Sequence, residues 1–483
     1  MIRKLTLLLI CFKGYIDLMS IWMPKLDGRR GAKYQQLVEA LAEDIASGRL
    51  PPGARLPPYR ELAYRLGMSA QTVSRAYAQA TRRGLLRGET GRGTFVIDPS
   101  RQAASVAPAS LARETSGPID LSRNLPSPSR ADGPLRDILR EIGATADLRM
   151  FLDYQSGDGE GPTHAAAARR WLQECGLDTR AGEVIGTCGA QHGLFCALTG
   201  LLSPGDLMLS EALGYAPVRV IAERLALRAL PVEIDAEGVC PESLERLCRD
   251  RPVRLLYLTA TLQSPTTSTM SDERRRRIAE IARRHDMLIL EDDVFGRLKD
   301  DRPLPIACFA PERTIYVTSL SKSVAPGLRI GFLHAPDALA DAVRRAVVLS
   351  VWMTPPLMSE IAARLIESGM ALRLLLDQRA TAQRRQTLAR QILGRFDLNA
   401  DPQGLHAWLR LPDGWNAGSF RAAAEARGVL VSDARDFAAP GVVAPVAARL
   451  SLGHEASDAR LETGLTRLAD LLSQPPRSDA LFL

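Results

Sequence analysis

The sequence is poor in the residues on which disulfide-bonded and zinc-bound proteins depend. It has seven cysteines and six histidines among 483 residues, and the cysteines are scattered. There is no Cys-x-x-Cys pair and no zinc-finger spacing of cysteine and histidine. These absences exclude the usual zinc motifs and favour reduced thiols in a cytoplasmic protein. We therefore expect no metal site.

The sequence also lacks a convincing secretory or membrane-spanning segment at its start. The apolar run in residues 1–24 follows Arg3 and Lys4, as in a signal peptide, but it is far shorter than the ~20 residues that cross a bilayer. No small-residue cleavage site follows it. We interpret residues 1–24 as an extension ahead of a start near Met19 or Met23, and we expect no association with a membrane.

Positive charge is in excess, and most of the excess lies near the start of the chain. The formal net charge is +7, from 62 Lys and Arg against 55 Asp and Glu. Residues 25–100 alone hold 13 basic and 7 acidic side chains. Because 483 residues exceed one ordinary core, we expect two or three folding units. A small basic unit beside a large, nearly neutral one indicates nucleic acid as the partner of the small unit.

Residues 31–97 have the pattern of a winged helix-turn-helix domain. Apolar residues recur at four-residue spacing between positions 34 and 47, which predicts a first helix. A short second helix ends at Gly67, and a third, capped by Ser69, runs to Gly84. The stretch "LLRGETGRGTFVI" then predicts a two-stranded wing.

In such a domain the third helix reads the major groove of double-stranded DNA through its first turn. The segments "GRLPPGARLPPYRELA", "SAQTVSRAY" and "GRGTFV" resemble the N-terminal domain of GntR-family transcription regulators. The alternative is a three-helix module that binds protein. The residues that the helix geometry and the resemblance assign to DNA are Arg60, Gln71, Thr72, Arg75, Arg92 and Gly93.

Residues 98–118 separate this domain from the rest of the chain. They are rich in Ala, Ser and Pro and show no sustained periodicity, which predicts a flexible linker. We therefore expect a DNA-binding domain over residues 25–97 and a larger domain over residues 119–483.

The larger domain alternates short apolar runs with helical segments. The runs at 255–261, 287–296 and 314–320 predict strands, and residues 272–285 predict a helix between the first two. This alternation indicates an α/β domain with a mostly parallel sheet. In such sheets, functional groups collect at the carboxyl ends of the strands.

Four groups lie at those ends, and together they suit one cofactor, although each taken singly could be incidental. Lys322 follows a strand and could form a Schiff base with a carbonyl if its pKa is lowered. Asp292 ends a buried strand and needs a partner such as a protonated pyridine nitrogen. Arg329 and Ser319 could bind a phosphate, as could the N–H groups of a helix start at residues 189–191. These are the requirements of pyridoxal 5′-phosphate.

Residues 119–483 resemble the fold-type-I aminotransferases, which have a large and a small subdomain. "TSLSKSVAPGLRIG" is similar to the lysine motif of that family, and "EDDVFG" to its pyridine-nitrogen motif. The resemblance implies that Lys322 holds pyridoxal 5′-phosphate as an internal aldimine and that Arg449 holds a substrate's α-carboxylate. It also implies a homodimer, in which Tyr154 reaches the cofactor phosphate of the neighbouring subunit. The other cofactor-binding residues that it implies are Gly189, Ala190, Gln191, Tyr215, Ser264, Asp292, Ser319 and Arg329.

Two positions depart from the pattern of those enzymes. Ser264 stands where they usually have an Asn that binds the cofactor's phenolic oxygen, and Phe295 replaces a Tyr that donates to the same oxygen. With both donors altered, we expect the phenolate to hold the aldimine proton and to raise the aldimine pKa. Neither change abolishes cofactor binding, but both count against efficient transamination.

A GntR-like winged helix, a linker and an aminotransferase-like domain in one chain resemble the MocR-type regulators. The resemblance implies a cytoplasmic, dimeric transcription regulator that senses a small amine or amino acid by transimination at Lys322. Two alternatives stay open: an active aminotransferase with a DNA-binding appendage, and a sensor of the cofactor level itself.

Overall fold

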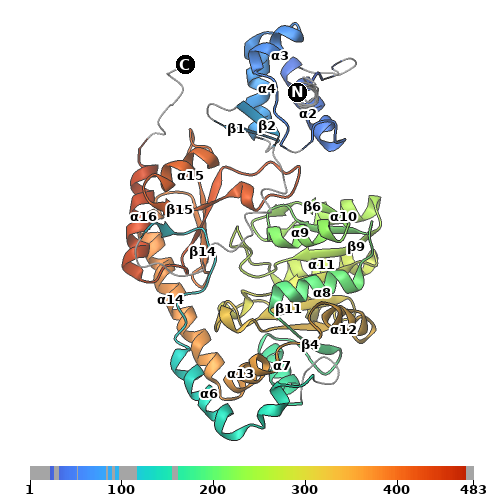
Figure 1. Cartoon of the computed structure of the whole chain (residues 1–483), viewed down its shortest axis with the longest axis vertical. Coiled ribbons are helices and arrows are strands. Elements are labelled where there is room, and N and C mark those ends of the chain that lie inside the picture. Colours follow the sequence, from blue (N-terminus) through green and yellow to red (C-terminus); the bar gives the residue numbers. More distant parts are fainter. Residues whose placement is uncertain are drawn as a thin grey trace, which may run out of the picture. The chain divides into compact units, whose positions relative to one another are not determined.

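The protein divides into two compact units, residues 1–110 and 111–483, each of which is described separately (Figure 1). The predicted wing tip at residues 90–92 and nearly all of the predicted linker lie outside the described residues. The computed structural model describes residues 22–24, 26, 32–51, 53–82, 85–89, 93–96, 117–154 and 162–474.

The first unit is a winged helix-turn-helix, as the sequence predicts. Its third helix begins after Ser69, whose hydroxyl oxygen accepts a hydrogen bond from the Thr72 N–H at 3.1 Å. Leu41, Leu62 and Val73 are almost fully buried and join the helices in one core. The two wing strands pair in an antiparallel arrangement. The elements are α2 (Lys33–Ala46), α3 (Tyr59–Arg65), α4 (Ala70–Arg82), β1 (Leu86–Glu89) and β2 (Gly93–Val96).

Trp22 packs into the core of this first unit, although it lies in the stretch expected to be an extension. Its side chain is only 9% exposed. The indole N–H donates a hydrogen bond to the Asp44 carboxylate at 2.7 Å, and Leu26 packs against the same core. The folded unit therefore uses residues ahead of position 25.

The second unit is built on a seven-stranded sheet with the order β4-β12-β11-β10-β9-β5-β6 (Figure 1). Strand β12 is antiparallel to both of its neighbours, and the other pairs are parallel. The interior strand β11 is buried along its whole length, as expected of a sheet covered by helices on both faces. The strands are β4 (Glu183–Thr187), β5 (Leu207–Glu211), β6 (Arg228–Val232), β9 (Val253–Leu258), β10 (Leu288–Asp292), β11 (Thr314–Ser319) and β12 (Gly331–Ala335).

Helices cover the two faces of this sheet in separate groups. Helices α8, α9 and α12 share a core with one set of strand side chains, and α7, α10, α11 and α13 pack with the alternate set. The bounds are α6 (Asp132–Thr145), α7 (Pro162–Glu174), α8 (Ala190–Leu201), α9 (Ala216–Arg224), α10 (Pro241–Asp250), α11 (Asp272–Arg284), α12 (Asp337–Val351) and α13 (Pro356–Glu367). Shorter elements are β7 (Ile234–Asp235), β8 (Gly238–Val239), η2 (Leu148–Phe151), η3 (Gly296–Leu298), η4 (Ile306–Cys308) and η5 (Pro326–Leu328).

A smaller subdomain follows the long helix α14 (Figure 1). Its four-stranded sheet has the order β13-β14-β17-β16, and its core is separate from that of the large sheet. Strand β3, close to the start of the second unit, pairs with β15 of this subdomain. The elements are β3 (Ile119–Asp120), α14 (Met370–Leu393), β13 (Leu398–Ala400), β14 (His406–Arg410), α15 (Ala417–Glu425), β15 (Val429–Leu430), β16 (Ser432–Asp433), η6 (Ala434–Asp436), β17 (Ala447–Ser451) and α16 (Asp458–Leu472).

The mostly parallel central sheet and the smaller second sheet confirm the α/β domain with a large and a small subdomain that the sequence predicts. Among the described residues, no helix combines the length and the apolar character that a membrane crossing requires.

Candidate functional site

Lys322 lies three residues beyond the carboxyl end of β11, in the turn that leads to η5. The strand ends at Ser319, which is buried and whose hydroxyl accepts a hydrogen bond from the Ser321 N–H at 3.3 Å. The ε-amine of Lys322 donates to the backbone carbonyl of Asn124 and lies 5.6 Å from the centre of the Phe295 ring. The half-buried amine therefore sits between an aromatic ring and the first segment of the second unit.

The surroundings of Lys322 favour its neutral, nucleophilic form. Burial lowers the pKa of Lys322 to about 8, Arg449 and Arg329 act in the same direction, and Asp292 opposes them. At pH 8 about half of such amines are unprotonated, against about 0.3% for a lysine with the usual pKa near 10.5. An unprotonated amine is the form that attacks a carbonyl.

Asp292 ends β10 with one carboxylate oxygen bound and the other unbound. The Tyr257 hydroxyl donates to Oδ2 at 2.9 Å, while Oδ1 is buried and accepts no hydrogen bond from any described residue. Burial raises the pKa of Asp292 to about 6, against the effect of the Tyr257 hydrogen bond. At pH 7 the carboxylate is thus mostly ionised and able to pair with a cationic N–H donor.

A cup for an anion forms where α8 begins. Gly189 precedes the helix at φ +85°, and the guanidinium of Arg329 lies against it, donating to the Cys188 carbonyl at 3.0 Å. A Cβ on Gly189 would lie 2.7 Å from the nearer Arg329 nitrogen, so a larger residue there would displace the guanidinium, and the positive φ also favours glycine. The N–H groups of the first helical turn, at Ala190 and Gln191, have no partner within an α-helix and favour an anion, as does the guanidinium.

Tyr215 contacts this cup through Gln191. It stands at the start of α9, and its hydroxyl donates to the side-chain oxygen of Gln191 at 3.2 Å. Burial raises the pKa of Tyr215 to about 12, with Asp292 adding to the rise and Arg329 opposing it. The ring therefore lies within the electrostatic reach of both groups.

Arg449 projects from β17 of the small subdomain and is buried. It donates to the Ser264 hydroxyl at 3.2 Å, to the Ser432 hydroxyl at 3.4 Å and to the Ser122 carbonyl, and its guanidinium lies 4.6 Å from the Phe437 ring centre. Burial lowers the pKa of Arg449 to about 10, so it stays cationic at neutral pH. Ser264 therefore contacts the arginine that is predicted to hold a substrate's carboxylate.

Sequence reasoning missed Asn124, Tyr257 and the role of His406. The His406 ring accepts from the Asn124 amide at 3.1 Å and donates to the Gln263 carbonyl at 3.0 Å. Burial lowers the pKa of His406 to about 3, so the ring is neutral at pH 7. A tyrosine in a buried central strand needs a hydrogen-bond partner, which is a signal for Tyr257. Asn124 gave no such signal, because it meets Lys322 through its backbone.

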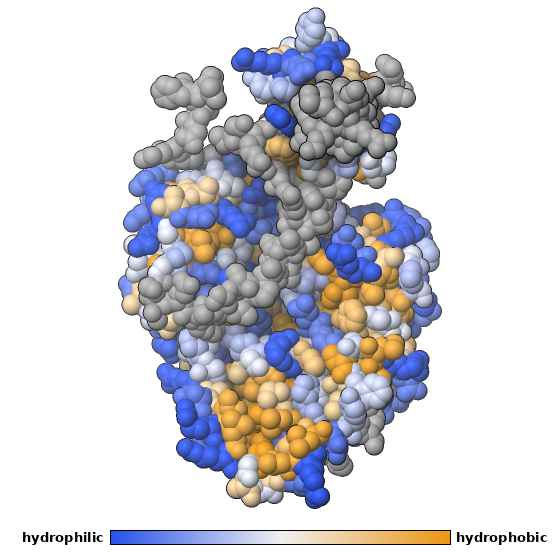
Figure 2. Space-filling view, in the orientation of Figure 1, coloured by the Kyte–Doolittle hydropathy of each residue, from blue (hydrophilic) through white to orange (hydrophobic). Residues whose placement is uncertain are grey.

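Tyr154 lies on the surface of the second unit and is far more exposed than Tyr215, the other predicted cofactor tyrosine, which is 37% exposed. The Tyr154 side chain is 79% exposed and packs against Trp352, with ring centres 5.6 Å apart. Figure 2 shows apolar areas on the surface of the second unit. Near Tyr154 in the sequence, or near Trp352, the exposed apolar residues are Leu148, Met150, Leu152, Leu349 and Val351.

The predicted DNA-reading residues that the structure describes are accessible. Gln71 and Arg75 are exposed on α4, and the Arg75 guanidinium lies 4.1 Å from the Tyr34 ring centre. Thr72 is partly buried next to the helix cap. Arg60 is exposed on α3, and Arg92 lies outside the described residues.

Gly93, at the start of the second wing strand, allows a basic side chain to lie against the wing. Its φ of +119° favours glycine, and a Cβ would lie 2.9 Å from the Arg55 guanidinium nitrogen Nε. Arg55 also bridges to Phe95 of the same strand. Arg55 therefore adds a further exposed cation to the candidate DNA surface, one that sequence reasoning missed.

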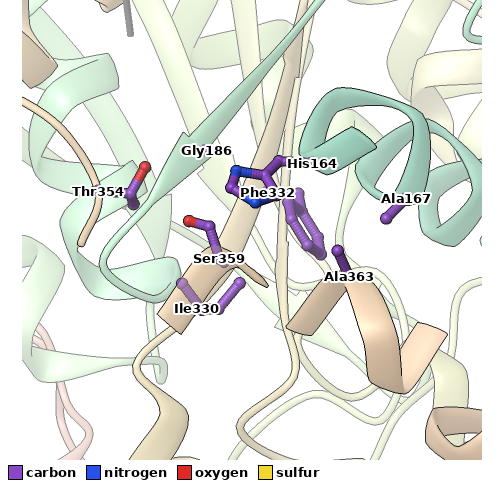
Figure 3. A pocket seen from close by; sticks show the side chains of 9 residues that line it. His164, Ala167, Gly186, Ile330, Phe332, Thr354, Ser359 and Ala363 are labelled. Carbon is purple, nitrogen blue, oxygen red and sulfur yellow. The ribbon is translucent and has the colours of Figure 1, made fainter. Parts of the chain in front are cut away.

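One enclosed cavity lies apart from Lys322, between α7, α13 and the strands β4 and β12. Figure 3 shows His164, Ser359 and Thr354 around it. Its volume of about 10 Å³ suits a single water molecule and is too small for a cofactor or an effector.

Comparison with known proteins defines the class of each unit. Residues 33–96 match the family described as "Bacterial regulatory proteins, gntR family", and residues 116–468 match "Aminotransferase class I and II". The second unit also has the fold of the kynurenine aminotransferase of Pyrococcus horikoshii, solved in complex with PMP. The two superpose with a TM-score of 0.70 over 80% of this chain and 95% of that one, at 24% identity.

Two relatives match both units together. The uncharacterized HTH-type transcriptional regulator YdeF of Bacillus subtilis is 30% identical over 93% of this chain and 96% of its own length. The vitamin B6 salvage pathway transcriptional repressor PtsJ of Salmonella typhimurium is 29% identical over 86% of this chain and 93% of its own length. The chain belongs to the HTH-type transcriptional regulators that join a GntR-family domain to an aminotransferase class I/II domain, the MocR type expected from the sequence.

Proposed function

We propose that this regulator binds pyridoxal 5′-phosphate at Lys322 and senses a small amine or amino acid through it. The observation that carries the proposal is the convergence of three groups. These are the low-pKa amine of Lys322, the unpaired oxygen of Asp292 and the anion cup at Gly189 and Arg329. In pyridoxal 5′-phosphate an aldehyde, a pyridine nitrogen and a phosphate are the matching chemical groups.

Each residue has a separate task in cofactor binding. Lys322 would supply the amine that holds the aldehyde group. Asp292, held by Tyr257, offers its free oxygen to the protonated pyridine nitrogen. Arg329, with Ser319 and the first turn of α8, provides donors for the phosphate. When bound, the cofactor supplies a carbonyl carbon that exchanges one amine for another.

An effector with a primary amine would exchange with Lys322. In such an exchange the effector nitrogen would replace the lysine Nζ on the aldehyde carbon and two protons would pass to Nζ, so no oxidant or reductant would be required. Arg449, buried and cationic, selects effectors with a carboxylate near the amine. Ser264 and Phe295 leave the ring oxygen without its two usual donors, which favours sensing over efficient transamination.

The first unit would convert this event into a change in DNA binding. Gln71, Thr72 and Arg75 occupy the first turns of α4, which in this motif enters the major groove, and Arg60 provides a cation on the preceding helix. Phosphate contacts of this kind make the affinity depend steeply on salt. We place the regulator in the cytoplasm, on promoter DNA.

The functional form that we propose is a homodimer. Exposed Trp352 packs against Tyr154, and their sequence neighbours Leu349 and Leu152 are 83% and 82% exposed; exposed apolar residues of this kind, where they gather, commonly mark an interface. In the dimer, Tyr154 would serve the partner's phosphate site. A Leu349→Arg variant should shift the protein towards monomer in light scattering, whereas a dimer of unchanged mass would contradict this interface.

A second candidate is a sensor of the cofactor level itself, favoured by the similarity to PtsJ, whose name assigns it to vitamin B6 salvage. Both candidates require cofactor binding, and they differ in whether an amine is needed.

The deciding experiment is a screen of amines against the cofactor-loaded protein. Effector binding is read as a change in visible absorbance, and DNA affinity is measured on the same samples, for wild type and Lys322→Ala. We expect a carboxylated amine to change both readings in wild type and neither in the variant. An amine that changes DNA binding equally in Lys322→Ala would refute sensing through Lys322. A response to the cofactor alone, with no responding amine, would favour the second candidate.

A further inference from the structure

Residues 119–127, near the start of the second unit, touch both side chains that the proposed effector would engage. Its Asn124 carbonyl accepts from the Lys322 amine, and its Ser122 carbonyl accepts from the Arg449 guanidinium. Residues 119–127 are called the strap below. Both contacts use backbone oxygens, so they depend on where the strap runs rather than on its side chains.

The strap is anchored on each side of these two contacts. At its start, the N–H groups of Ile119 and Leu121 donate to the carbonyls of Gly428 and Leu430, both at 2.8 Å, in the small subdomain. At its end, Ser127 exchanges two hydrogen bonds of 3.0 Å with the side chain of Gln378 on α14. The middle of the strap is thus held in position over the site from both ends.

Side chains hold the middle of the strap as well. The Asn124 amide donates to the neutral His406 ring at 3.1 Å, and the Ser432 hydroxyl donates to the Ser122 carbonyl at 2.9 Å. A Cβ on Gly453 would lie 2.1 Å from the Leu125 carbonyl, which shows how closely the chain passes the subdomain. A change at Lys322 or Arg449 therefore acts directly on a closely packed segment.

The bond between Lys322 and Asn124 can form only when the lysine is a free amine. Joined to an aldehyde carbon, Nζ is held by the cofactor and its donors are no longer available to the Asn124 carbonyl. Displaced by an effector amine, Nζ is a free amine again and can return to that carbonyl. An effector carboxylate likewise competes with the Ser122 carbonyl for the donors of Arg449.

We propose that the strap reads the chemical state of Lys322 and Arg449 and is the element through which effector binding reaches the linker at 98–118. This inference rests on the proposed function and adds the route of regulation to it. The strap follows the linker directly in sequence, so a change in its hydrogen bonds acts on the chain that leads to the DNA-binding domain. Such a segment has two arrangements of contacts, and the two states of Lys322 bias them differently.

The test compares two cofactor forms that fill the same pocket. Pyridoxal 5′-phosphate has an aldehyde that binds Lys322, whereas pyridoxamine 5′-phosphate has an amine in its place and leaves Lys322 free. Hydrogen exchange of the full-length protein is measured for the amides of residues 119–127 in each form. Losing the bond from Lys322 should make these amides exchange about fivefold faster with pyridoxal 5′-phosphate than with pyridoxamine 5′-phosphate.

A lysine variant identifies the donor. With pyridoxamine 5′-phosphate, Lys322→Ala should exchange in the strap as fast as wild type does with pyridoxal 5′-phosphate. Lys299→Ala, which removes a lysine paired with Asp301 and Asp401, serves as the matched control and should follow wild type in both forms.

The outcomes distinguish failure of the strap from failure of the proposed function. Equal exchange in the two forms, with the visible absorbance of a lysine-bound cofactor present, refutes the strap and leaves the proposed function standing. Slow exchange in Lys322→Ala with pyridoxamine 5′-phosphate also refutes the strap. If wild type shows no such absorbance, the proposed function fails and the strap fails with it.

Discussion

Replacing Tyr257 by Phe tests whether the hydroxyl behind Asp292 sets the ionisation of that carboxylate. The hydroxyl donates to Asp292 at 2.9 Å in a fully buried setting. A hydrogen bond to a charged group is worth about 1.5–3 kcal/mol, and one pKa unit corresponds to about 1.4 kcal/mol. Removing it should therefore raise the pKa of Asp292 by about one to two units above its value near 6.

The sign of the effect follows from which form of Asp292 binds the cofactor. The ionised carboxylate pairs with a protonated pyridine nitrogen, so affinity is lost as the pH falls through the pKa of Asp292 in the free protein. For wild type this loss should be centred near pH 6. In Tyr257→Phe it should be centred between about pH 7 and pH 8, which makes cofactor binding at pH 7 up to tenfold weaker. At pH 9 the two proteins should bind almost equally.

The assay is an absorbance titration with pyridoxal 5′-phosphate between pH 5 and pH 9. Tyr316→Phe is the matched control. Tyr316 lies on β11, which pairs with the strand that ends at Asp292, and its hydroxyl donates to Asp293 rather than to Asp292. The profile of this variant should follow wild type. Coincident profiles for wild type and Tyr257→Phe would refute the role given to this hydroxyl.

Three further changes test other parts of the structure. Gly189→Ala should weaken binding of pyridoxal 5′-phosphate at least tenfold in the same absorbance titration, because the new Cβ meets the Arg329 guanidinium. Gly205→Ala is the control: it lies at φ +90° in open space, so it bears the same backbone strain and should bind the cofactor normally. Trp22→Ala should destabilise the first unit by about 3–5 kcal/mol in calorimetry of the full chain. The exposed Met23→Ala should change little, and equal unfolding temperatures for the two variants would contradict the packing of Trp22. Arg60→Ala should reduce the slope of log affinity against log salt by about one in DNA titrations, and an unchanged slope would place this cation away from phosphate.

Much of the fold and part of the site follow from local sequence patterns. The strands that end at Asp292 and Ser319 were predictable because each is a short apolar run followed by polar residues. Ser69 marked the start of α4 because a hydroxyl at that position satisfies a free N–H group of the helix. Lys322 and Gly189 were predictable because the carboxyl ends of parallel strands meet at one edge of the sheet.

The rest depends on contacts that no local pattern encodes. Asn124 and Ser122 reach the site through backbone carbonyls, more than 190 positions away from the side chains that they accept from. Trp22 stands in a stretch whose composition resembles a leader, and its burial depends on α2 being folded beside it. The task of Tyr154 needs a second copy of the chain, and it stays a prediction.

The central claim is that Lys322 carries the cofactor, and reduction with borohydride tests it most directly. Purified wild type and Lys322→Ala are incubated with pyridoxal 5′-phosphate, reduced and digested, and the modified peptide is identified by mass spectrometry. We expect a visible absorbance band in wild type that disappears on reduction, with the added mass on Lys322 alone, and no band in the variant. No band in wild type, or a label on another lysine, would contradict the claim and leave the second unit without its proposed sensor.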